Sequence, residues 1–218
     1  MTEAELTTLL LLATASSFTP GPNTTLSTAL AANRGLRGAM HFVCAVPVGW
    51  GLLFTLCAAG LGTLVVAVPL LRWGILGGGL AYLLWLAARL ANTRSLSEAD
   101  SSRLNVTFWQ GVTLQFLNIK AWMLALAVVA GWIAGRPDAT ARTLQVLPLM
   151  VAFGFFSNLT YAWTGALLRQ WLKGPVVDGV ATGGRLLVFN RTMAGVLLLT
   201  AAWMGWSALA ATQPGGLP

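Results

Sequence analysis

The chain has 218 residues and a net charge of +7; 56% of its residues are hydrophobic and only 9% are charged. Soluble domains carry about 25% charged residues, so this composition and a mean hydropathy of +0.74 exclude an ordinary soluble protein. The few basic residues fall mainly in short polar stretches, which favours topology signals over a nucleic-acid-binding surface. We therefore expect an all-α integral membrane protein that lies in a lipid bilayer and binds no nucleic acid.

The first predicted span, residues 6–30, is interrupted by the sequence Thr19-Pro-Gly-Pro-Asn23. Pro20 and Pro22 lack backbone N–H groups, and each ring clashes with the preceding turn, so a regular helix cannot continue. Freed backbone groups are tolerated inside a membrane only against protein or a cavity, and such broken helices often form the binding sites of transporters. A simple proline kink is the alternative interpretation.

A polar segment, residues 93–107, follows two further predicted spans at residues 40–66 and 69–90. It divides what we expect to be a single transmembrane domain into the halves 1–92 and 108–211. Flexible polar segments of this kind connect structural units rather than form part of a packed core.

The fourth apolar run carries a lysine deep inside it, between Trp109 and Trp132. As a straight helix these tryptophans would lie about 35 Å apart, close to the hydrocarbon thickness of a bilayer, and tryptophan prefers the interfaces. Lys120 would then lie near the midplane, too far from the headgroups for its side chain to reach them. It needs a partner, a water-filled cavity or the ability to lose its proton, which makes it a candidate functional residue. The alternative is a lysine held permanently by carbonyl groups at a helix C-terminus.

Two more spans, at residues 144–168 and 193–211, complete six predicted transmembrane helices. The loops after spans 1, 3 and 5 hold nine Lys or Arg residues and the other two hold three, which predicts that both termini are extracytoplasmic. Two halves of three spans each would have to be inverted repeats. Span 1 would then correspond to span 4, so the Pro-Gly-Pro break and the Lys120 segment would face each other.

Six short segments stand out along the chain. They are Phe18-Thr-Pro-Gly-Pro-Asn23, Asn33-Arg-Gly-Leu-Arg-Gly38, Gly79-Leu-Ala-Tyr-Leu-Leu-Trp-Leu86, Phe108-Trp-Gln-Gly111, Leu117-Asn-Ile-Lys-Ala121 and Arg191-Thr-Met-Ala-Gly195. Together they resemble the motifs of the LysE/RhtB-type amino-acid exporter (translocator) family. The resemblance implies a secondary transporter that exports amino acids or related small metabolites across a bacterial inner membrane, driven by an ion gradient. The chain departs from the family at Ile119, where the pattern has proline, which leaves open whether span 4 is broken. It also has Asn23 where many members carry aspartate.

The distribution of charge favours a neutral, zwitterionic substrate. All six acidic residues fall outside the predicted spans, so a basic amino acid would lack a counter-charge, whereas a substrate carboxylate could pair with Lys120. Backbone carbonyls freed around Gly21 could accept from the ammonium group. We expect H+ to be the coupling ion, with Lys120 alternating between holding a proton and holding the carboxylate. The candidate substrate-binding residues are Lys120, Asn23, Asn118, Pro20, Gly21, Pro22, Gln115, Asn158 and Tyr161.

Other classes of membrane protein remain as alternatives. His41 is the only histidine and no zinc-like spacing exists, so we expect no catalytic residues, no metal and no cofactor, and an enzyme is disfavoured. A channel could use the same polar midplane, and a structural membrane protein would suit the glycine-rich helices. The sequence leaves open which amino acid is carried and whether the protein is a homo-oligomer.

Overall fold

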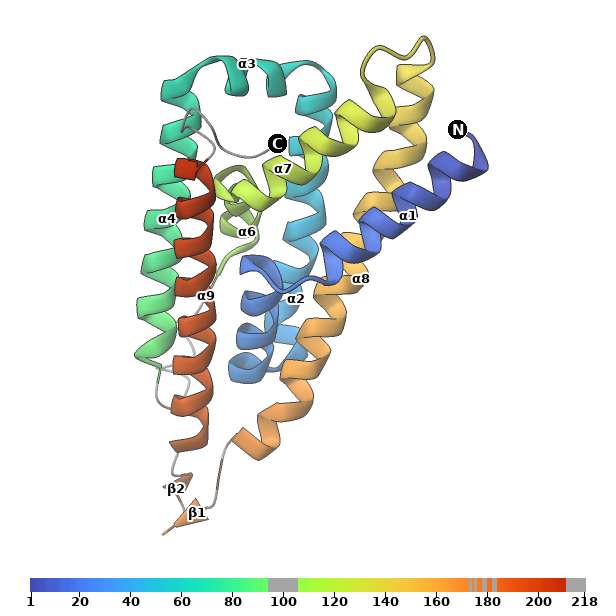
Figure 1. Cartoon of the computed structure of the whole chain (residues 1–218). Coiled ribbons are helices and arrows are strands. Elements are labelled where there is room, and N and C mark those ends of the chain that lie inside the picture. Colours follow the sequence, from blue (N-terminus) through green and yellow to red (C-terminus); the bar gives the residue numbers. More distant parts are fainter. Residues whose placement is uncertain (94–105, 173, 175, 178–179, 182–183, 211–218) are drawn as a thin grey trace.

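The computed structural model describes residues 1–93, 106–172, 174, 176–177, 180–181 and 184–210, and almost all of these are helical (Figure 1). Most of the predicted polar segment 93–107 and the end of the sixth predicted span therefore lie outside the described residues. The elements are α1 (Glu3–Phe18), α2 (Pro22–Ala58), α3 (Leu61–Ala67), α4 (Pro69–Ala91), α6 (Phe108–Leu117), α7 (Ile119–Val128), the π-helical turn η1 (Val129–Ile133), α8 (Ala139–Leu172), the antiparallel strands β1 (Val176–Val177) and β2 (Val180–Ala181), and α9 (Gly184–Ala210).

Among the described residues, four helices are long and apolar enough to cross a membrane: α2, α4, α8 and residues Gly184–Ser207 of α9. A fifth crossing arises if α6 and the α7–η1 segment count as one span, since they are bent by 68° at a short break. The predicted all-α fold is thus confirmed, and these apolar helices are consistent with a membrane protein. Six separate spans are not confirmed, because α1 has 16 residues and is shorter than the roughly 17–25 residues that a spanning helix needs.

The predicted loop between spans 1 and 2 is reduced to a turn at Gly35 within α2. Gly35 has φ 75° and ψ 169°, a backbone conformation that favours glycine because a Cβ would be strained there. In Figure 1 the darker blue start of α2 descends from the break after α1, and the lighter blue remainder ascends beside it towards α3. A single helical element therefore includes the end of the first predicted span and most of the second.

Helix α2 is central because it contributes to both large apolar clusters. One cluster joins it to α4 and α9 through residues such as Phe42, Leu83 and Leu197. The other joins it to α1, α7 and α8 and includes Phe54 and Met150. Many other large apolar side chains are exposed, as expected of surfaces that contact lipid; on α8 they include Leu144, Phe156, Trp163, Leu167 and Trp171.

Candidate functional site

The first helix break lies between α1 and α2. Helix α1 ends at Phe18, Thr19 is extended (φ −71°, ψ 128°), and α2 begins at Pro22. Because Pro22 has no N–H, the carbonyl of Phe18 lacks the donor that a continuous helix would supply four residues later. Side chains from other helices satisfy three successive carbonyls: Ser157 Oγ donates to Ser17 O (2.5 Å), Tyr161 OH to Phe18 O (2.9 Å) and Lys120 Nζ to Thr19 O (2.9 Å).

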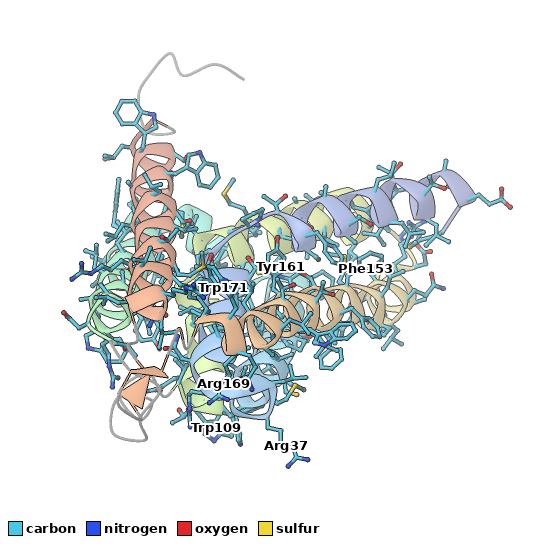
Figure 2. The ribbon with its side chains drawn as sticks, turned by 90° about the horizontal axis from the view of Figure 1, so that it is seen from below. Arg37, Trp109, Phe153, Tyr161, Arg169 and Trp171 are labelled. Carbon is cyan, nitrogen blue, oxygen red and sulfur yellow. The ribbon has the colours of Figure 1, made fainter. Side chains whose placement is uncertain are left out.

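Two of these donors belong to one face of α8. Ser157 and Tyr161 are four residues apart, the spacing at which helix side chains become neighbours. Figure 2 shows Tyr161 between α8 and α1. The sequence interpretation assigned Tyr161 to the substrate and did not select Ser157. In the structure both hold the end of α1, and their i, i+4 spacing beside a proline-broken span is the signal that could have revealed this role.

The second helix break lies at Asn118, between α6 and α7. Asn118 Oδ1 accepts from the backbone N–H of Lys120 (3.1 Å), so that N–H no longer bonds to the carbonyl of Phe116. Trp122 Nε1 donates to this carbonyl instead, at 2.8 Å. The fourth apolar run is therefore broken even though Ile119 stands in place of proline. The straight-helix distance of about 35 Å between its bracketing tryptophans is wrong for the same reason.

The two breaks face each other, as the sequence analysis expected. Besides the contact between Lys120 and Thr19, a reciprocal amide pair joins the start of α2 to α6. Asn23 Nδ2 donates to Gln115 Oε1 (2.9 Å), and Gln115 Nε2 donates to Asn23 Oδ1 (3.1 Å). Gln115 is fully buried. Because buried amides must be hydrogen-bonded, this pair fixes the distance between the two broken segments.

A cavity of about 80 Å³ lies where the breaks meet. Among the described residues that line it, Lys120 is the only one with an ionisable side chain. A Cβ at Gly21 would lie 3.3 Å from Lys120 Nζ, so glycine leaves room for the ammonium group. The polar lining residues are Ser16, Ser17, Thr19, Asn23, Thr24, Asn118, Lys120 and Asn158, and the apolar ones include Val46, Pro47, Trp50, Ala121, Leu124, Met150 and Val151.

The predicted site residues thus divide into two groups. Lining the cavity are Lys120, Asn23, Asn118, Gly21, Pro22 and Asn158. Asn158 is held by Ser27 Oγ, which donates to its Oδ1 at 2.9 Å, and its own Nδ2 donates to Gly154 O at 2.8 Å. Pro20, Gln115 and Tyr161 are not among the lining residues; they shape the breaks. The sequence analysis did not select Thr19. Its contribution is a backbone carbonyl, which every residue has, so the residue type gives no signal.

Helix ends of both polarities converge on this cavity. The N-termini of α2 and α7 carry partial positive charge, and the C-termini of α1 and α6 carry partial negative charge. An anionic and a cationic group of one small ligand would each find a complementary helix end there.

Away from the cavity, an ion-pair cluster attaches the start of α1 to the start of α8. Glu5 Oε1 lies 3.1 Å from Arg142 Nη1 and 3.4 Å from Arg136 Nη2. Arg142 Nε also donates to both carboxylate oxygens of Asp138, each at 2.9 Å. This hydrogen bond lowers the pKa of the Asp138 carboxyl. The cluster holds α1 near α8 at the end remote from the break.

Known proteins are similar to this chain over most of its length. The model of the LysE type translocator family matches residues 14–199. The cysteine/O-acetylserine efflux protein of Escherichia coli (strain K12) is 27% identical over 161 residues, which cover 72% of this chain and 80% of that protein. Proteins with that name from Escherichia coli O1:K1 / APEC and Shigella flexneri serotype 5b (strain 8401) match to the same extent. No solved structure matches the chain significantly. Since the family match covers most of the chain and both helix breaks, the protein belongs to the LysE type translocator family and is a membrane transporter rather than an enzyme.

Proposed function

We propose that the protein exports neutral, zwitterionic amino acids or closely related metabolites across the bacterial inner membrane, driven by an ion gradient with H+ as the coupling ion. One observation carries this proposal: Lys120 Nζ donates to Thr19 O at 2.9 Å, at a cavity formed where two broken helices meet. Intramembrane cations are costly, and at such a cavity they usually serve a transported species.

The helix ends and the lysine together favour a zwitterion. A substrate carboxylate is attracted by Lys120 and by the N-termini of α2 and α7, while the carbonyls at the end of α1 accept from the ammonium group. Among the described lining residues none is acidic, so a basic side chain meets no counter-charge. The relatives' names, cysteine and O-acetylserine efflux, also point to small neutral amino acids.

In this mechanism Lys120 exchanges partners during transport. In the structure its ammonium group donates to Thr19 O. An arriving carboxylate replaces that carbonyl as the acceptor, and the freed carbonyl becomes available to the substrate ammonium group. For an inward H+ gradient to drive export, Lys120 must release its proton to the cytoplasm when the carboxylate binds and take up another from the extracytoplasmic side after the substrate has left. Lys120 then alternates between holding a proton and holding the carboxylate. Proton movement and substrate movement are thereby coupled at a single side chain.

The arrangement of helices supports six crossings in two inverted halves, 1–92 and 108–211. In this proposal α1 and the first part of α2 form one interrupted crossing, and the turn at Gly35 begins the next. The first crossing of each half is then broken, as in other inverted-repeat transporters. Helices α2 and α8 pack together, as do α4 and α9, which suits a pseudo-two-fold relation. The excess of basic residues in the odd-numbered loops supports an orientation with both termini outside the cytoplasm.

Efflux from vesicles loaded with radiolabelled amino acids tests the function. We expect saturable, gradient-dependent efflux of small neutral amino acids. Their methyl esters, which lack the carboxylate, should leave at least about tenfold more slowly, because the charge-assisted contact is lost. Lysine should be a poor substrate. Flux that neither saturates nor depends on the gradient would instead indicate a pore, and equal transport of the esters would exclude carboxylate recognition.

A further inference from the structure

Trp50 of α2 borders the cavity with a buried hydrogen-bond donor that has no acceptor. Its side chain is 8% exposed, and across the part of the chain that the structure describes, Nε1 finds no partner. Other tryptophans of the molecule do find one: Trp122 donates to Phe116 O at 2.8 Å and Trp132 to Glu5 O at 3.0 Å. Because buried N–H groups are nearly always paired in native structures, an exception needs an explanation.

Packing holds the indole ring in its present orientation. It stacks on Phe54, with ring centroids 5.1 Å apart and an interplanar angle of 18°. It also belongs to the apolar cluster that includes Leu9 of α1 and Met150 of α8. Rotating the ring towards a distant acceptor would break these contacts. Tyr82 OH and Arg169 Nε are likewise buried without a partner among the described residues, but neither residue lines this cavity.

The position of Trp50 within the cavity is informative. The polar lining residues come largely from the two breaks, whereas Trp50 packs in one apolar cluster with Met150 and Leu124, which also line the cavity. In that apolar part of the described lining, the indole supplies the only side-chain N–H. A zwitterion whose charged groups contact the breaks would direct its own side chain towards this part.

We infer that Trp50 is a specificity-determining residue that donates its indole N–H to an acceptor atom in the substrate side chain, such as an ether, ester or hydroxyl oxygen. The inference rests on the proposed function. The apolar surroundings accept a short carbon chain, and the donor favours one that carries an oxygen. A substrate without an acceptor leaves the N–H unsatisfied, and buried polar groups left unpaired are a strong source of discrimination.

Two amino acids of nearly the same shape test the inference. O-methylserine and norvaline differ only in whether the second side-chain atom, at the γ position, is an ether oxygen or a methylene. In vesicles containing the wild-type protein, we expect kcat/KM for efflux to favour O-methylserine by about tenfold, the size expected of one neutral hydrogen bond in a buried site. Trp50→Phe keeps an aromatic ring against Phe54 but lacks the N–H. In this variant the ratio of kcat/KM for O-methylserine to that for norvaline should fall to near one, mainly because O-methylserine is transported more slowly.

Two further variants keep the test decisive. Trp109→Phe removes a tryptophan that is 72% exposed and outside the cavity, and it should retain the wild-type preference. If Trp50→Phe does not insert, 3-benzothienylalanine at position 50 retains the shape and replaces the N–H with sulfur. Unaltered preference in either Trp50 variant overturns the inference, as does a wild-type ratio near one. If the wild type carries neither amino acid nor other neutral ones, the proposed function itself fails.

Discussion

Both helix breaks interrupt an apolar helical segment, but different groups cause them. Between α1 and α2 the break is covalent in origin, because Pro20 and Pro22 remove donors and obstruct the preceding turn. Between α6 and α7 every residue could in principle continue a helix. There Asn118 supplies the break by accepting the N–H of Lys120, and Trp122 takes the carbonyl that this leaves free.

The difference shows how far each break depends on its neighbours. The first break would persist in an isolated peptide, whereas the second is maintained by a side-chain cap and by helices packed around it. Substitutions around the second break should therefore have the larger effects on stability. Each substitution at the first break should mainly remove the hydrogen-bond donor of a single backbone carbonyl.

The largest effect should come from Gly79→Ala in α4. A Cβ at Gly79 would collide with the carbonyl of Leu117, the last residue of α6, so α4 would have to move away from the second break. Overpacking of this kind lowers the free energy of unfolding by about 1–3 kcal/mol. Thermal unfolding of the purified protein in detergent should show a lower Tm. Gly77→Ala is the matched control, since nothing lies near its Cβ position; equal Tm values for the two variants would contradict the packing described.

Asn118→Ala should have the next largest effect. The substitution removes the cap of α7, which costs about 1 kcal/mol, and it allows α6 and α7 to straighten. We expect efflux of neutral amino acids to fall about tenfold as the cavity loses its shape. Asn118→Ser keeps a capping oxygen and should retain most of the activity. Comparable activity of wild type and Asn118→Ala would show that the cap does not maintain the break.

Tyr161→Phe tests the first break more gently. It deprives Phe18 O of its donor at the end of α1 and should lower the free energy of unfolding by about 0.5–1.5 kcal/mol. Thr160→Val, one residue earlier on α8, removes a hydroxyl that bonds within its own helix, to Phe156 O. Differential scanning calorimetry should show a larger decrease in Tm for Tyr161→Phe than for Thr160→Val. The reverse order would argue against the contact between Tyr161 and Phe18.

The smallest effect on stability is expected from Ile119→Pro, although a proline inside an apolar run would ordinarily be costly. Ile119 is the first residue of α7, where a helix needs no N–H, and Asn118 already has an extended backbone (φ −94°, ψ 103°) compatible with a following proline. Ile119→Pro should therefore change the free energy of unfolding by no more than about 1 kcal/mol. Met123→Pro, inside the same helix, should cost about 3 kcal/mol. A similar loss of unfolding free energy in Ile119→Pro and Met123→Pro would show that position 119 lies within a continuous helix.

The sequence predicted those parts of the site that depend on residue type. Two prolines around a glycine are visible without a structure, and so is a lysine inside an apolar run. Their meeting could be expected from the topology and is confirmed by the bond between Lys120 and Thr19. Asn118 was selected as a polar residue, but its role as a cap was not, since a single asparagine in an apolar helix has several common roles.

Other parts of the site depend on tertiary contacts and could not be predicted. Trp50 is one tryptophan among ten, and only its unpaired N–H beside the cavity distinguishes it from ordinary packing residues. Gln115 and Tyr161 were expected to contact substrate, yet they pair with Asn23 and with Phe18 O. The turn at Gly35 joins two predicted spans into one helical element, because a single positive φ takes the place of the expected loop.

Efflux by Lys120→Met tests the central claim most directly, namely that the lysine joining the two breaks handles the substrate. Methionine keeps the length of the side chain to within one atom and removes its charge. The account therefore predicts background efflux from loaded vesicles at wild-type protein levels, while Arg37→Met on the exposed surface transports normally. Lys120→Arg should also fail, because a guanidinium neither releases its proton nor fits the space beside Gly21. Saturable, gradient-dependent efflux at the wild-type rate by Lys120→Met would contradict the account.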